Sequence, residues 1–355
     1  MDGSTPSADR LGMQTSIAAA VLLTIGLALP AQAAVPTTNP VDLEREAMRQ
    51  MGTEDDLLRS AGDVDAIPLD AKTDEYLKSR RPVLDLLRQA AAMPRADWGP
   101  IDGDMTKVME FLSPARHAVQ LTWLAARSDA AAGRWEAAVD DLLSGLAVAR
   151  HVGQQPLLLC HLVEIGASVG TIDRLAKLLP SLPKEVAAAL PAKLDALPPY
   201  AGWPAMIDGE RAFSRVTLAE QFAAAGQGKP SPVAQAMTDA LGPLYDAMKG
   251  KPGQLPADLQ RDIDAAVAKM PLNMFAKILG PSFSRARPNS AMAEAKFAML
   301  RTAADIAAKG PSALADSDDP FGDGPFTRAD VADGYTLTSQ LIHEKDGPVT
   351  LKVAP

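Results

Sequence analysis

Cysteine and aromatic residues are scarce in this sequence. Its 355 residues include one cysteine, Cys160, and phenylalanine, tryptophan and tyrosine together make up only 5% of the chain. A single cysteine excludes an intramolecular disulfide. Stability must therefore come from burial of apolar side chains, and a chain of this length can build a sizeable core.

Positive charge is also in deficit. The chain has 44 Asp and Glu residues against 35 Lys and Arg residues, a formal net charge of -9. Nucleic-acid binding draws most of its affinity from neutralisation of phosphates by basic side chains. We therefore expect no nucleic-acid partner and no binding to membrane surfaces through basic residues.

Familiar catalytic motifs are missing as well. The sequence has no Gly-x-Ser-x-Gly elbow, phosphate loop, dinucleotide fingerprint, His-Glu-x-x-His motif or kinase set. We expect a noncatalytic protein rather than an enzyme, although missing motifs do not exclude an activity, and we predict no cofactor.

The first 33 residues have the pattern of a bacterial export signal. An apolar core of about a dozen residues, Ile17–Leu29, is too short to span a bilayer, and Ala31-Gln32-Ala33 offers small residues to a signal peptidase. We predict cleavage after Ala33 and an exported protein, periplasmic or secreted. The alternative is an uncleaved membrane anchor, because residues 16–35 carry no formal charge.

Most of the remaining chain is expected to be helical. Alanine, leucine and methionine are abundant, and apolar positions recur three and four residues apart. The predicted helices cover residues 39–49, 73–93 (divided or kinked at Pro82), 113–132, 135–151, 156–179, 184–197, 204–225, 231–249, 256–269, 271–279 and 290–309. This organisation predicts a mainly α fold of helical hairpins, with a helical domain at 34–225 and a helical subdomain or continuation at 226–312.

Residues 313–355 have a different sequence pattern from the helical region. Alternating apolar and polar residues at 334–339 and 348–353 predict two strands, and Glu344-Lys-Asp-Gly347 supplies a hairpin turn. Since an isolated hairpin is only marginally stable, we expect a small two- or three-stranded β tail packed on the helical body.

One helical hairpin resembles part of a tetratricopeptide repeat. Gly133, Trp135, Ala138, Leu142 and Gly145 follow the spacing of the second helix of that repeat. No second copy follows at a period of 34 residues, so we interpret the segment as a related hairpin with similar packing, outside a repeat array.

A longer resemblance covers about Leu84–Ser214. A helix ending in Arg88–Met93, the Ala-Ala-Gly-Arg-Trp-Glu-Ala-Ala turn, the apolar run Leu157–Ala167 and Gly209–Phe213 occur in that order. This order is similar to exported, mostly helical proteins of unknown function that some environmental bacteria carry in many divergent copies. The resemblance implies a helical fold and export, and no activity.

The third resemblance is confined to Asp319–Ser339. Asp319-Pro-Phe-Gly-x-x-Pro-Phe326, followed by the run Gly334–Ser339, is similar to the carboxy-terminal turn and strand of type II secretion pseudopilins. No pilin-type helix with a processing site accompanies it, and we interpret it as local convergence on one kind of turn.

Two sets of polar residues are candidates for a site in the helical region. His161 and Glu164 are three residues apart, so a helix places both on one face, but no further metal ligands match their spacing. Asp208, Glu210 and Arg211 lie among apolar residues, which favours a buried Glu–Arg pair as a structural clamp over a ligand-binding role.

The remaining candidates are an acidic loop and the single thiol. Asp316, Asp318, Asp319 and Asp323 offer hard oxygen ligands near glycines, as calcium prefers, but without the spacing of an EF-hand. Cys160 lies in an apolar run, which favours a buried, unreactive thiol. We predict no metal site, and the only candidates for one are His161, Glu164, Asp318, Asp319 and Asp323.

The sequence leaves two functions open. The first is a noncatalytic envelope protein whose helices present a groove to an unidentified protein partner. The second is an enzyme or small-ligand binder with a pocket in the helical bundle, built around His161, Glu164, Glu210 and Arg211. A closed polar pocket would favour the second function, and an open apolar groove the first.

Overall fold

A computed structural model gives the fold of the chain after residue 38. Contacts divide the chain into two units, Met1–Thr38 and Asn39–Pro355. The structure describes residues 39–52, 57–58, 63–99, 105–225, 232–250, 256–268, 273–343 and 347–355, all in the second unit. The predicted export signal therefore lies outside the described residues.

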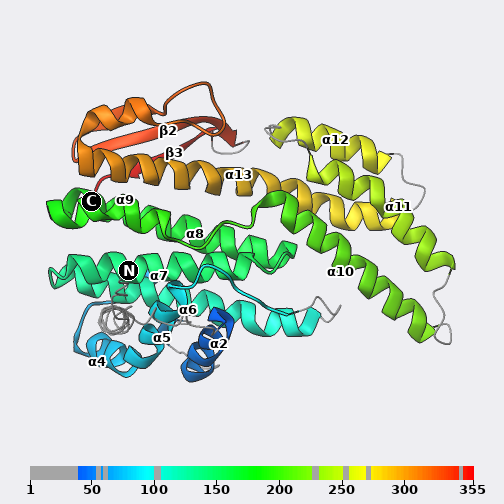
Figure 1. Ribbon diagram of the computed structural model, residues 1–355, viewed down its shortest axis with the longest axis horizontal. Coiled ribbons are helices and arrows are strands. Elements are labelled where there is room, and N and C mark those ends of the chain that lie inside the picture. The colour runs from blue at the N-terminus through cyan, green and yellow to red at the C-terminus, as the bar shows by residue number, and fades with distance from the viewer. Residues whose placement is uncertain are drawn as a thin grey trace, which may run out of the picture. The chain divides into compact units, whose positions relative to one another are not determined.

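The mainly α fold is confirmed, and a small antiparallel sheet closes the chain (Figure 1). The α-helices are α2 (Pro40–Met51), α4 (Ala71–Ser79), α5 (Arg81–Ala91), α6 (Met105–Ala131), α7 (Trp135–Gly153), α8 (Leu158–Leu178), α9 (Lys184–Asp195), α10 (Gly202–Ala225), α11 (Pro232–Lys249), α12 (Pro256–Ala268) and α13 (Asn273–Lys309). Short 3₁₀ helices are η1 (Val64–Ala66), η2 (Leu179–Ser181) and η3 (Pro311–Asp316). None of the helices in the described ranges is long and apolar enough to cross a membrane.

Local signals explain where several helices begin and end. The side chain of Asn39 accepts a hydrogen bond from Val41 N (3.2 Å) and caps α2. The predicted break at Pro82 is confirmed, since α4 ends at Ser79 and Pro82 lies in the first turn of α5. Gly133, with φ +74°, turns the chain between α6 and α7.

Two predicted helix boundaries were wrong. Helix α6 does not begin at Ser113-Pro114 but at Met105, and Pro114 lies inside it between the buried Leu112 and Ala115. The helices predicted at 271–279 and 290–309 are one helix, α13, of 37 residues. Proline removes one helical hydrogen bond, and burial of the residues around it outweighs that loss in α6.

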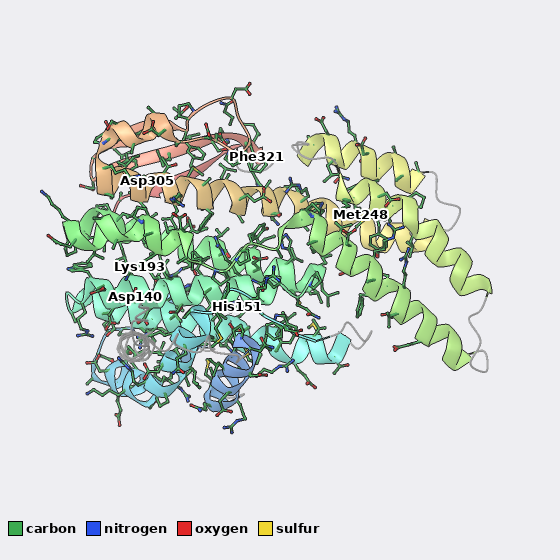
Figure 2. All side chains as sticks on the ribbon, in the orientation of Figure 1. Asp140, His151, Lys193, Met248, Asp305 and Phe321 are labelled. Atoms are coloured by element: carbon green, nitrogen blue, oxygen red, sulfur yellow. The ribbon has the colours of Figure 1, made fainter. Side chains whose placement is uncertain are left out.

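The central body is a stack of packed helices. Figure 1 shows α13, α8 with α9, α7 and α6 in successive layers, with α2, α4 and α5 on the far side of α6 and α7. Lys193 of α9 and Asp140 of α7, labelled in Figure 2, form an ion pair (2.6 Å) across two of these layers. Helix α8 packs against α7 on one side and α13 on the other.

A second group of helices adjoins one end of this body. Helices α10, α11 and α12 pack with the first part of α13 (Figure 1) around a core that includes Met206, Leu244 and Ile263. Trp203 Nε1 donates to the carbonyl oxygen of Met248 (2.7 Å), which is labelled in Figure 2. The same core includes Leu158, so the beginning of α8 is held by this group.

The carboxy-terminal sheet lies against the second part of α13. Its order is β1 (Thr327–Val331), β2 (Gly334–His343) and β3 (Gly347–Val353), all antiparallel. The two predicted strands are confirmed, and the mostly exposed β1 is a third strand. The inward residues of β2 and β3, such as Leu337 and Leu351, share a core with Met299 and Leu300 of α13.

Candidate functional site: the two faces of helix α8

The beginning of α8 is capped by a residue from α10. Leu157 occupies the N-cap position and has no polar side chain to satisfy the first amide groups of α8. The carboxylate oxygen Oε2 of Glu210 accepts a hydrogen bond from Leu158 N (2.9 Å) instead. Burial raises the pKa of Glu210, and the bond from Leu158 opposes that change.

A buried polar network lies on the inner face of α8. His161 Nδ1 lies 3.1 Å from Glu164 Oε2, and His161 Nε2 lies 3.1 Å from the hydroxyl of Ser290 in α13. The hydroxyl of Tyr200 lies 3.0 Å from the Ser290 hydroxyl and 3.3 Å from His161 Nε2. His161, Glu164 and Ser290 have no exposed surface, so the network holds α8, α13 and the segment before α10 together.

Glu164 faces the end of α7 at very close range. A Cβ atom built on Gly153 would lie 1.9 Å from Glu164 Oε2, so only glycine fits there. Burial raises the pKa of Glu164, although the hydrogen bond from His161 opposes the change. Its other oxygen, Oε1, has no hydrogen-bond partner among the described residues.

A cavity of about 310 Å³ adjoins this network between α7, α8 and α13. It is lined by Leu146, Arg150, Ser168, Ile172, Tyr200, Ala293, Glu294 and Phe297. Arg150 is 8% exposed, donates from Nη1 to the carbonyl oxygen of Pro198 (2.7 Å) and faces the Phe297 ring at 4.2 Å. Burial lowers the pKa of Arg150 to about 10.

The outer face of α8 forms an open groove with α6, about 640 Å³ in volume. Its lining is mostly apolar and consists of Met109, Leu112, Ser113, Arg116, Val119, Gln120, Trp123, Leu159, Leu162, Val163, Gly166 and Ala167. A Cβ atom built on Gly166 would meet no described atom within 4 Å. One turn further along α8, Gly170 is covered by the ring of Trp123, whose nearest carbon would lie 2.7 Å from such a Cβ.

No family model matches this chain, and no curated protein or solved structure is significantly similar to it.

The predicted Glu210–Arg211 pair does not form, because each residue has a different partner. Arg211 pairs with Asp246 of α11 (2.9 Å) and Asp208 pairs with Lys249 at the end of α11 (2.6 Å). These three charged residues thus attach α10 to α8 and to α11. The structure brings His161 and Glu164 together and keeps them apart from Arg211.

The acidic loop uses one of its carboxylates for internal bonding. Asp319 is buried and accepts hydrogen bonds from the hydroxyl of Ser339 (2.8 and 2.9 Å), from Gln340 N (2.6 Å) and from Phe321 N (3.0 Å). Asp316, Asp318 and Asp323 are exposed. Among the described residues no three His, Cys, Asp or Glu side chains are grouped so as to hold a metal ion.

Cys160 is fully buried, and burial raises the pKa of its thiol to about 12. A thiol in this state carries almost no thiolate at neutral pH. The interpretation of Cys160 as a core residue agrees with its place in a cluster with Leu112, Leu157 and Phe213.

Sequence reasoning missed a second buried acid–histidine pair. Glu44 Oε1 of α2 lies 2.6 Å from His151 Nδ1 of α7, labelled in Figure 2, and His151 Nε2 lies 2.7 Å from the carbonyl oxygen of Met93. A signal was available, because Glu44 lies on the apolar stripe of α2 between Val41 and Met48. No local sequence pattern indicated that Arg150 and Ser290 would be buried polar residues near the site.

Proposed function

We propose that this chain is a noncatalytic, exported interaction protein of the cell envelope. Its groove between α6 and α8 takes an amphipathic helix from a partner protein, and that helix carries a carboxylate at the edge of its apolar face. The observation that carries the proposal is Gly166, which lies uncovered in an apolar groove.

The glycine at position 166 is not required by its packing against the described residues. Glycine inside a helix costs about 1 kcal/mol relative to alanine, and nothing described lies above Gly166 to repay that cost. Glycine and other small residues on a helix allow a second backbone to approach closely. A partner helix lying along α8 accounts for the residue.

The groove has the length and surface of a helix-binding site. Its α6 wall runs from Met109 to Trp123, about four helical turns or roughly 20 Å. Met109 is 52% exposed and Leu159 is 37% exposed, so large apolar side chains meet solvent on both walls. Exposed apolar surface of this kind is typical of sites that bind the apolar face of a helix.

The charge on the groove determines the chemistry of the partner. Arg116 is the single charged residue of the lining and is exposed, and no carboxylate within the described ranges forms an ion pair with it. An acidic side chain beside the apolar face of the bound helix would pair with this guanidinium. A basic or purely apolar helix would leave that interaction unused.

The use of polar residues supports a noncatalytic role. His161, Glu164, Tyr200 and Ser290 bond mainly to one another, and three of these four residues have no exposed surface. The thiol of Cys160 is buried as well.

Export is proposed on the pattern of residues 1–33, with a retained anchor as the alternative. Intact-mass analysis of the periplasmic fraction of a bacterial host should give a chain beginning at Ala34, whereas a full-length chain in the membrane fraction would support the anchor.

Site-specific crosslinking tests the groove directly. A photoreactive benzoylphenylalanine replaces Leu159 in the groove or, as a matched control, the exposed Ile342 on the sheet. We expect a discrete crosslinked protein from position 159 in envelope preparations and none from position 342. The crosslinked peptide should have an apolar helical face with an adjacent acidic residue.

The crosslinked segment is then synthesised and its binding measured with purified full-length protein. Gly166→Leu, which fills the groove, should abolish binding, and Arg116→Glu should weaken it about tenfold or more. Equal crosslinking at both positions, crosslinking to lipid or to a second copy of this chain, or undiminished binding by Gly166→Leu would each overturn the proposal.

A further inference from the structure

We propose that the cavity between α7, α8 and α13 binds a small organic carboxylate. Its carboxylate pairs with Arg150, and its compact apolar body lies among Leu146, Ile172 and Phe297. This inference concerns the inner face of α8 and does not depend on the groove on the outer face.

The size and lining of the cavity suit a small molecule. Its volume, about 310 Å³, is at the lower end of the range for ligand pockets, and most of its lining is apolar. Leu146, Ile172 and Phe297 come from three different helices, α7, α8 and α13. Three walls of this kind enclose a compact hydrocarbon group.

Arg150 provides the charge that selects the ligand. Its side chain is almost completely buried, and of its five N–H groups one has a hydrogen bond within the described parts of the chain, from Nη1 to Pro198 O. No described carboxylate lies within 4.0 Å of it, although buried charges in proteins are normally paired. The guanidinium carbon of Arg150 lies 4.2 Å from the centre of the Phe297 ring, a contact that does not neutralise its charge.

Each acidic side chain near the cavity has one partner within the described chain. Glu294 lies 3.4 Å from Arg287, and Glu164 bonds to His161. Burial raises the pKa of Glu164, and its hydrogen bond to His161 and its electrostatic attraction to Arg150 oppose that change. A bidentate pair with a carboxylate would use the free N–H groups of Arg150 and stabilise the buried charge.

The probe is 4-methylpentanoate, compared with the alcohol and the amine of the same carbon skeleton. We expect titration calorimetry on the full-length protein to show saturable binding of the acid, with a rise in melting temperature, and binding of the alcohol about 10- to 100-fold weaker. No binding of the acid, or equal binding of acid and alcohol, would overturn the proposal. Preferred binding of the amine would overturn it as well.

Two variants separate recognition from folding. Arg150→Gln should lose the preference for the acid over the alcohol. Because Arg150→Gln also removes a bond to Pro198 and can lower stability, Ala293→Leu provides an independent test, since it fills the cavity and retains the arginine. Ala293→Leu should lose all binding while keeping a native melting transition, and the groove variant Gly166→Leu should bind the acid as the native chain does. Unaltered binding of the acid by Ala293→Leu would place the probe elsewhere and refute the assignment.

Discussion

The two faces of α8 differ in whether contacts within the described chain explain their residues. On the inner face, Glu164 lies against Gly153 of α7, where any side chain would collide with the carboxylate. The polar groups of His161 and Ser290 on this face bond to each other. On the outer face, no described atom lies within 4 Å of a Cβ built on Gly166, and the surrounding groove is mostly apolar. One helix thus has one face determined by contacts within the chain and another whose composition we attribute, as a proposal, to a partner protein.

Gly153→Ala is expected to have the largest effect and tests the inner face. Its Cβ would lie 1.9 Å from Glu164 Oε2, so the buried carboxylate must move and lose its bond to His161. Overpacking of this kind costs about 2–3 kcal/mol of unfolding free energy, measurable by urea denaturation. The shorter carboxylate of Glu164→Asp in the double variant should recover part of the loss, and additive losses would show that the two residues are not in contact.

Glu210→Ala should be next in size. It leaves Leu158 N without its acceptor at the beginning of α8, which we expect to cost about 1–2 kcal/mol. Glu210→Gln keeps an acceptor and should cost less than half as much. Arg211→Ala breaks an exposed ion pair with Asp246 and serves as the control, with an expected loss of about 0.5 kcal/mol or less. Equal losses in Glu210→Ala and Arg211→Ala would argue against the cap.

Gly166→Ala should change stability in the opposite direction. With no described atom above the site, alanine gains up to about 1 kcal/mol from its higher helix propensity. Thermal unfolding of the purified protein measures this gain. A clear loss of stability would mean that the position is already covered, and the contrast between the two faces of α8 would disappear.

The smallest expected effect is in the pH dependence of stability. Burial raises the pKa of Glu44, Glu164 and Glu210. A raised pKa means that the folded state holds the proton more tightly than the unfolded state, so stability falls as pH rises from the ordinary glutamate pKa through the raised value. Glu164→Gln cannot ionise and should show a shallower fall in urea midpoint as the pH rises above the ordinary glutamate pKa. An unchanged slope would indicate that the pKa of Glu164 in the folded state is ordinary.

Helical periodicity made most of the fold predictable. The spacing of apolar residues, the Asn39 cap and the Gly133 turn are local signals, and they place α2, α7, α8 and the hairpin between α6 and α7 correctly. Proline positions gave a wrong helix boundary where a proline lies inside a packed helix, as Pro114 does in α6. Strand β1 was missed because it has only five residues, most of them exposed, and its apolar residues are limited to Ala329 and Val331.

The candidate sites were predictable only in part. His161 and Glu164 share one turn of helix, so their spacing was enough to join them. Their partners come from distant segments, since Ser290 is 129 residues from His161, and no local pattern reveals such a contact. The cavity beside Arg150 depends in the same way on three helices meeting, which only the tertiary structure determines.

Helix α13 has a thermodynamic consequence for the whole helical unit. Its first part packs with α12, and its second part packs with α8, α9 and the sheet. Thirty-seven residues of one helix therefore belong to two cores at once. Neither core can melt without fraying the helix that supports the other, so the unfolding of residues 39–355 should be cooperative, and calorimetric and van't Hoff enthalpies should agree.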